Sequence, residues 1–318
     1  MQTYDDCLCI FYMLQIIIGI FGNDLLLCLY GFNLISSQRI RSIDVILVNL
    51  ALSHIILILF RGVPLAIKVC NQKIFLSDNA CKIIIYLQRV ARGLSLCTTC
   101  LLSIFQTIII SSSSPQWTKL RAKDPKFIAL CCVFIWVLSL LIDMDVPLYV
   151  TGTRNNTVID FKGYLGFCFI DWHAISMSKL VIWKTLYDAV FMGFMAITNA
   201  YMVLFLVRHH WKIQYLHNTT LKPIASPETR ATKVILLLMI IFVCFYSLAS
   251  IFVIFMENSK DTNQYIMYIP VLLSLSYAII SPFVLISSDS HVFIYSIIKN
   301  FYLNILKSHS KDTKTISL

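Results

Sequence analysis

Residues 127–150 read FIALCCVFIWVLSLLIDMDVPLYV, and the first 16 of these 24 positions carry no charged side chain. A helix of about 20 mainly apolar residues spans the hydrocarbon core of a bilayer, because each residue adds about 1.5 Å. Six other stretches share this character, so the sequence predicts seven spanning helices, at about 8–35, 44–67, 82–110, 127–150, 183–207, 234–256 and 265–287. The expected fold is an all-α integral membrane protein, a seven-transmembrane-helix bundle that forms a single domain over residues 1–318.

The overall composition excludes a soluble enzyme. Of the 318 residues, 58% are hydrophobic and 13% are charged, whereas a typical soluble domain carries about 25% charged residues. A transmembrane β-barrel would instead show alternating segments of about 10 residues. The sequence contains no HExxH, GxSxG or phosphate-loop motif and no Cys/His spacing typical of zinc sites. We therefore expect no enzyme activity, no cofactor and no metal.

A shorter amphipathic pattern follows the seventh span. Within residues 291–306, Lys299 lies off a face of apolar side chains at helical spacing, which are Phe293, Ile294, Ile297, Ile298, Phe301 and Ile305. A helix of this kind lies on a membrane rather than across it. We expect a short surface helix at 291–306 and a flexible tail at 307–318.

The basic residues indicate the orientation. If the N-terminus is extracellular, the inner loops and tail hold 15 of the 26 Lys and Arg residues, and the outer loops hold eight. Lys and Arg concentrate in cytoplasmic loops, so we expect an extracellular N-terminus and a cytoplasmic C-terminus at the plasma membrane. The net charge of +10 then points to membrane lipid as a partner, not to nucleic acid. The sequon at Asn155 would be extracellular and N-glycosylated, whereas the one at Asn218 would be cytoplasmic.

The cysteines at the outer ends of the predicted spans are candidates for disulfides. They are Cys7, Cys9, Cys70, Cys81 and Cys168. A bond between Cys81 and Cys168 would hold the second outer loop over the mouth of the bundle, and the oxidising exterior permits it. We expect this bond; the alternative is that both remain free, buried thiols.

Five motifs together resemble the vomeronasal type-1 receptors, a family of pheromone-sensing G-protein-coupled receptors. They are RVARGLSLCTTCLLS at 89–103, SPETRAT at 226–232, YAIISPFVL at 277–285, NLALSH at 49–54 and Gly22-Asn23. The resemblance spans nearly the whole chain. It implies a receptor that binds a small volatile odorant or sulfated steroid from outside and activates an inhibitory-class (Gi/o) G protein.

The same regions depart from the pattern of rhodopsin-like receptors. Phe105-Gln106-Thr107 stands in place of Asp-Arg-Tyr, His54 replaces an Asp in the second helix, and Ser281-Pro282-Phe283-Val284-Leu285 replaces Asn-Pro-x-x-Tyr. The ionic lock and the sodium site of that class therefore cannot be assigned to this chain. Bitter taste receptors share this divergence but are a weaker match, because they lack a bond of the Cys81–Cys168 type.

Several charged residues fall inside the predicted spans, where they are costly and therefore candidates for function. Arg89 and Arg92 share one face of the third helix, and Arg61 lies at similar depth in the second. Arginine donates a planar fork to sulfate or carboxylate, so these three residues predict an anion site. The alternatives are ion pairs with Asp143, Asp145 or Asp188, or side chains that extend to the interface. The candidate ligand-binding set is Arg61, Tyr86, Arg89, Arg92, Asp143, Asp188, Phe245 and Tyr246; its aromatic members either line a cavity or fill space.

Two further polar groups lie deeper. Near the membrane midplane, the predicted cluster comprises Asn23, Asp24, His54 and Ser281, which either join helices by hydrogen bonds or, at His54, form a protonation switch. At the cytoplasmic end, the candidate G-protein-facing residues are Gln106, Thr107, Arg208, Trp211 and Arg230. The alternative for the basic ones is that they set topology and bind acidic lipid.

A different class of function remains open from the residues alone. Arg61, Arg89 and Arg92 would also suit the relay of a small organic-anion transporter or channel. Such transporters show paired broken helices and internal repeats, and the sequence shows neither. An intramembrane enzyme is a more distant alternative, because no catalytic pair stands out at matching depth on two helices.

Overall fold

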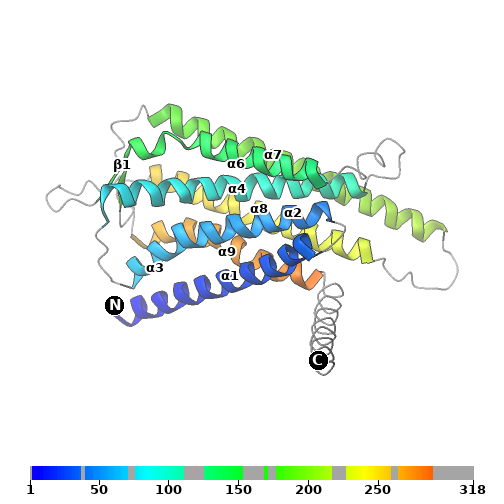
Figure 1. Cartoon of the computed structure of the whole chain (residues 1–318), viewed down its shortest axis with the longest axis horizontal. Helices are drawn as coiled ribbons and strands as arrows, with labels where there is room; N and C mark the ends of the chain where they lie inside the picture. The colour runs from blue at the N-terminus through cyan, green and yellow to red at the C-terminus, as the bar shows by residue number, and fades with distance from the viewer. Residues whose placement is uncertain are drawn as a thin grey trace, which may run out of the picture.

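The structure is a computed structural model that describes residues 2–36, 40–70, 76–110, 125–152, 168–170, 177–216, 227–258 and 264–288. Its helices lie side by side along the long axis of the molecule (Figure 1): α1 (Gln2–Ser36), α2 (Ser42–Leu57), α3 (Val63–Val69), α4 (Asp78–Ile110), α6 (Pro125–Ile142), α7 (Met177–Leu216), α8 (Pro227–Asn258) and α9 (Gln264–Ser288). A π-helical turn, η1 (Ile58–Gly62), joins α2 to α3, so the two form one span. The predicted seven-helix bundle is therefore confirmed.

Several helices begin or end at other residues than the predicted spans, because apolar composition alone does not show where a helix ends. The helix α6 ends at Ile142, not at 150, and a 3-10 turn, η2 (Val146–Leu148), follows. Pro147 lies in that turn; it has no N–H, and in a regular helix its ring would clash with the carbonyl of Asp143. In contrast, α7 and α8 extend beyond the predicted 183–207 and 234–256. The predicted surface helix at 291–306 and the tail at 307–318 lie outside the described residues.

Apolar length agrees with a multi-pass membrane protein. Six described helical segments are long and apolar enough to cross a bilayer, and α8 adds a shorter apolar stretch, Leu236–Phe252. Large apolar side chains on the periphery are exposed; Phe134 on α6 and Ile197 on α7 are 63% and 69% exposed. Such faces are stable against lipid tails and unstable in water.

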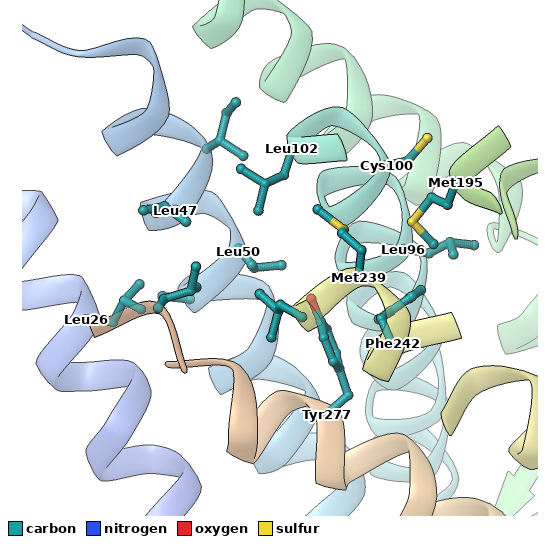
Figure 2. Packing of buried hydrophobic residues seen from close by; sticks show 14 of the residues in the cluster. Leu26, Leu47, Leu50, Leu96, Cys100, Leu102, Met195, Met239, Phe242 and Tyr277 are labelled. Carbon is teal, nitrogen blue, oxygen red and sulfur yellow. The ribbon is translucent and has the colours of Figure 1, made fainter. Parts of the chain in front are cut away.

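The main buried cluster lies where the long helices meet. Figure 2 shows Leu26, Leu50, Leu96, Met239 and Tyr277 pointing toward one another from five helices, and Met195 of α7 packs in the same cluster. The ring of Phe242 meets that of Tyr277 edge-on, with centroids 4.4 Å apart. A second cluster, around Tyr12, Ile58, Ala91 and Leu275, lies nearer the N-terminus of α1.

A small hairpin, which apolar runs did not predict, covers one end of the bundle. Strands β1 (Val150–Gly152) and β2 (Cys168–Ile170) pair antiparallel, with Gly152 opposite Cys168. The amide of Gly152 donates a 2.7 Å hydrogen bond to Asp78 Oδ1 at the start of α4. A β-carbon on Gly152 would lie 2.6 Å from the carbonyl oxygen of Leu76. Only glycine therefore allows the hairpin to approach α4 this closely.

We predict that Gly152→Ala lowers the melting temperature of the purified receptor by several degrees. The new methyl group must displace a backbone carbonyl, and overpacking of this kind costs about 1–3 kcal/mol. Gly193→Ala is the matched control, since nothing lies within 4 Å of a β-carbon there, and it should be neutral or slightly stabilising. Equal melting temperatures for Gly152→Ala and the wild type would contradict the close approach.

Candidate functional site

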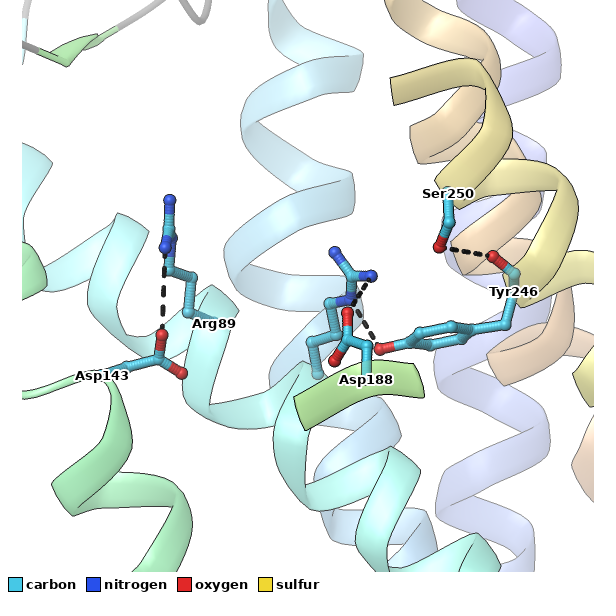
Figure 3. Close-up of polar contacts among 6 residues, drawn as sticks. Arg89, Asp143, Asp188, Tyr246 and Ser250 are labelled. Carbon is cyan, nitrogen blue, oxygen red and sulfur yellow. Dashed lines mark hydrogen bonds and ion pairs between the residues drawn. The ribbon is translucent and has the colours of Figure 1, made fainter. Parts of the chain in front are cut away.

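Arg92 is the centre of a charged cluster in the half of the bundle that carries the hairpin. Its Nη2 lies 2.9 Å from Asp188 Oδ2 on α7, and its Nε donates a 2.6 Å hydrogen bond to the Tyr246 hydroxyl on α8. The guanidinium also lies 4.7 Å from the centroid of the Tyr246 ring. One side chain of α4 thus contacts two other helices. Figure 3 shows the side chains of Asp188, from α7, and Tyr246, from α8, close to each other.

Arg89 lies one turn earlier on α4 and pairs with a different helix. Its Nη1 is 3.9 Å from Oδ1 of Asp143, just after the end of α6 (Figure 3). The longer distance makes this a weaker ion pair than that of Arg92. Beside it, the Tyr86 hydroxyl donates a 2.9 Å hydrogen bond to the carbonyl of Leu140, so α4 and α6 are joined twice at this level.

Arg61 differs from the other two arginines in having no carboxylate beside it. Its Nε is buried without a hydrogen-bond partner, and its guanidinium forms no ion pair within the part of the chain that the structure describes. The positive charges of Arg92 and Arg89 lie close enough to repel it.

The direction of Arg61 depends on the π-helical turn. Pro64 has no N–H, and its ring would clash with the carbonyl four residues earlier in a regular helix. The chain instead widens by one residue, so that the Val63 amide donates to the carbonyl of Ile58. Turns of this kind are frequent at functional sites. Here the turn packs against α4, α9 and α1 and rotates Arg61 relative to α2.

A pocket opens beside the paired arginines, between α4, the end of α6 and α7. It is lined by Arg89, Arg92, Gly93, Ile142, Asp143, Tyr187 and Asp188, and its cavity measures about 20 Å³. Sites for drug-sized molecules usually measure about 300–1,000 Å³, whereas this cavity has room for about one water molecule. A steroid therefore requires the helices around it to move apart. Phe245 does not belong to this region; it packs against the main buried cluster.

The predicted midplane residues join α1, α2, α4 and α9. His54 is 1% exposed; its Nε2 lies 3.0 Å from Ser95 Oγ and its Nδ1 3.2 Å from Ser281 Oγ. Asn23 donates separately to the carbonyls of Gly19 and Ala278. The structure thus brings His54 and Ser281 together, while Asn23 reaches α9 by its own bonds. Asp24 lies on the exposed face of α1, away from this group.

Sequence reasoning missed a second set of hydrogen bonds between helices. Asn49 Nδ2 donates to Thr98 Oγ1 at 2.8 Å, and Trp136 Nε1 donates to Asn49 Oδ1 at 2.6 Å, which joins α2, α4 and α6. Ser103 contacts Thr198 and Asn199 on α7. The sequence did offer one sign of these bonds: Asn49 carries an amide side chain inside an apolar span, where such a group must find a hydrogen-bond partner.

The residues proposed to face the G protein lie at the opposite end. Gln106 is buried, and Thr107 Oγ1 donates to the carbonyl of Ser103. Arg208 on α7 is exposed. Trp211 and Arg230 fall within α7 and α8, and their side chains lie outside the described residues, as does Asn155.

Two disulfides lie at the same end of the bundle. Cys81, at the start of α4, is bonded to Cys168 of β2, and Cys9 of α1 is bonded to Cys70, which follows α3. The second bond was not predicted, although both cysteines were recognised as candidates. The other seven cysteines are free. No group of His, Cys, Asp or Glu suited to a metal ion occurs among the described residues.

Comparison with solved structures identifies the class of protein. The structure matches squid rhodopsin with a TM-score of 0.69 and 17% sequence identity, over 89% of this chain and 77% of that one. At this identity the likeness shows the fold, which is that of the seven-helix G-protein-coupled receptors.

Residues 7–297 match the vomeronasal organ pheromone receptor family. The chain is 35% identical to vomeronasal type-1 receptor 4 of Pongo pygmaeus over 280 residues, which is 88% of this chain and 93% of that protein. It is also 35% identical to vomeronasal type-1 receptor 100 of Rattus norvegicus over 312 residues, 95% of this chain and 89% of that protein. The chain belongs to the vomeronasal type-1 receptor family, as the motifs indicated. It is therefore a multi-pass membrane receptor with a ligand and a G protein as partners, and not an enzyme.

We predict strong energetic coupling between Arg92 and Asp188. Each single variant, Arg92→Gln or Asp188→Asn, leaves a charge in the bundle without its ion-pair partner and should lower the melting temperature of the purified receptor. The double variant removes both charges and should recover part of this loss, with a coupling of about 1–3 kcal/mol. The same cycle at Arg89 and Asp143 is the comparison, and the longer ion pair should give less than about 1 kcal/mol. Equal coupling in the two cycles would contradict this assignment.

Proposed function

We propose that this receptor lies in the plasma membrane, binds a small volatile odorant or sulfated steroid from outside, and activates a Gi/o-type G protein. The main support for an anionic ligand is that the buried Nε of Arg61 has no hydrogen-bond partner within the described residues. Arg89 and Arg92 each have a carboxylate beside them. An anionic ligand would supply the counter-charge that Arg61 lacks, and would favour a sulfated steroid over its uncharged parent.

The proposed ligand-binding residues comprise Arg61, the ion pairs of Arg89 and Arg92, and three aromatic residues. They are Arg61, Tyr86, Arg89, Arg92, Asp143, Asp188, Phe245 and Tyr246. In this proposal Tyr246 and Arg92 lie between Arg61 and the pocket, so an anion at Arg61 reaches the hydrogen bond that joins α4 to α8. Phe245, one residue along α8, contributes by packing behind that contact.

Ligand binding is coupled to the cytoplasmic end through a shift between two populations. A ligand that draws Arg92 away from Asp188 or Tyr246 changes how α4 holds α7 and α8, and the state with the better fit becomes the more populated one. The proposed G-protein-facing residues, Gln106, Thr107, Arg208, Trp211 and Arg230, lie at or beyond the far parts of these helices. Their basic members suit the C-terminal helix of a G protein.

The proposed orientation places the disulfides outside. Lys and Arg concentrate at the opposite end of the chain's spans, and disulfides persist in the oxidising exterior. The N-terminus is then extracellular, the C-terminus is cytoplasmic, and the sequon at Asn155 is accessible to glycosylation.

We expect Asn155→Gln to increase the electrophoretic mobility of the receptor expressed in mammalian cells and to abolish its sensitivity to glycosidase. Asn218→Gln is the matched control, since its sequon would face the cytoplasm and carry no glycan. The reverse result, with the glycan on Asn218, would invert the topology.

The function is tested by Gi/o-coupled signalling in cells with confirmed surface staining, challenged with volatile odorants and with matched sulfated and unsulfated steroids. We predict a sulfate-dependent response whose half-maximal concentration rises about 10-fold or more in Arg61→Gln and Arg92→Ala, because each removes a charged hydrogen-bond donor. Lys82→Gln removes a positive charge at the start of the same helix α4 and should respond as the wild type does.

Two outcomes would change the proposal. A response to uncharged volatiles alone would keep the receptor and limit the arginines to ion pairs within the bundle. Uptake of a labelled organic anion without G-protein activation would favour the transporter or channel instead.

A further inference from the structure

The cavity beside the paired arginines matches a single water molecule in size and in lining. Its volume is about 20 Å³, and a cavity of about 10–15 Å³ or more can hold one water molecule. Its charged lining residues are Arg89, Arg92, Asp143 and Asp188. Cavities that stay dry inside proteins are apolar, whereas a water molecule needs two to four polar partners. This cavity offers polar partners on both sides.

The two ion pairs at the cavity leave hydrogen bonds that a water molecule can supply. Arg89 Nη1 and Asp143 Oδ1 are 3.9 Å apart, which is too far for a direct hydrogen bond and within the reach of a bridging water. On the other side, the contact of Arg92 with Asp188 uses only Oδ2. The Oδ1 atom of that carboxylate accepts no hydrogen bond from any described residue.

The hydroxyl group of Ser139 is a further partner. Ser139 is 2% exposed, and its Oγ has no hydrogen-bond partner among the described residues. It lies one turn before Ile142 and Asp143, which line the cavity, and therefore on the same face of α6. Opposite it, Gly93 of α4 also lines the cavity, and a β-carbon there would lie 3.5 Å from Ser139 Oγ. A buried hydroxyl without a partner is destabilising, and water in the cavity removes that cost.

We propose that an ordered water molecule occupies this cavity and joins the two ion pairs into one network. It accepts hydrogen bonds from Arg89 and Ser139. It donates its own two protons to the carboxylates of Asp143 and Asp188. The direct ion pairs link Asp143, at the end of α6, and Asp188, on α7, each to α4 alone. The water molecule adds a link from α6 to α7.

This inference goes beyond the proposed function, because the water molecule belongs to the receptor without a ligand. It also gives a reason for glycine within α4. Alanine is more stable than glycine inside a helix, and a methyl group at Gly93 would meet Ser139 at ordinary van der Waals distance. Alanine would therefore fit at this position, but its methyl group would take the space through which Ser139 reaches the water.

The melting temperature of the purified, unliganded receptor tests the water molecule. Ser139→Ala should lower it by a few degrees, because the variant loses a hydrogen bond to water. Gly93→Ala should also lower it, because displacing an ordered water without replacing its bonds is unfavourable. In the Gly93→Ala receptor the hydroxyl of Ser139 has no partner, so adding Ser139→Ala should now raise the melting temperature. Gly193→Ala is the matched control and reports the gain in helix propensity alone.

A dry cavity gives the opposite signs. Ser139→Ala would then remove an unpaired hydroxyl, Gly93→Ala would fill a void, and both would raise the melting temperature. That result would overturn the inference. A cryo-electron-microscopy map that resolves water should show one density peak between Arg89, Asp143 and Asp188 in the wild type and none in Gly93→Ala. A wild-type map without this peak would also overturn it. Neither measurement uses a ligand, so their failure is distinct from failure of the signalling test.

Discussion

The hydrocarbon of the bilayer offers no hydrogen bonds, and the arrangement of this receptor follows from that constraint. Backbone groups are satisfied within helices, and polar side chains in the core must find partners on neighbouring helices. Asn49 joins three helices, His54 joins α2 to α4 and α9, and Arg92 joins α4 to α7 and α8. The helix α4 takes part in all three contacts. Its polar face therefore sets the rotation and depth of its neighbours, around which the apolar side chains pack.

Apolar length predicted the seven spans because lipid selects for length and composition, and both can be read along one chain. Other features depend on contacts that a linear pattern does not encode. Strands β1 and β2 are three residues each, too short for any periodicity. The bond between Cys9 and Cys70 requires that the first helix begin beside the end of the second span. The end of α6 depends on Asp143–Pro147, where a run of apolar character continues although the helix does not.

The charged residues of the candidate site were predicted by type, and their pairing was not. Arg89 and Arg92 differ by one turn, and only the positions of α6 and α7 decide that one meets Asp143 and the other Asp188. Phe245 and Tyr246 are adjacent in sequence and point about 100° apart, so a single helix rotation separates a packing residue from a hydrogen-bond partner of Arg92. The direction of Arg61 follows from a π-helical turn caused by Pro64, three positions away.

The disulfides make the two ends of the bundle different. Both lie at one end and link α1 to α3 and α4 to the hairpin, whereas every other cysteine is free. Each bond holds its two segments together at that end, which provides a pivot for a tilting helix. A tilt of about 10° about that pivot displaces the far end of a ~30 Å helix by about 5 Å, while the pivot itself hardly moves. Such a tilt would move the opposite surface by about the length of one helical turn.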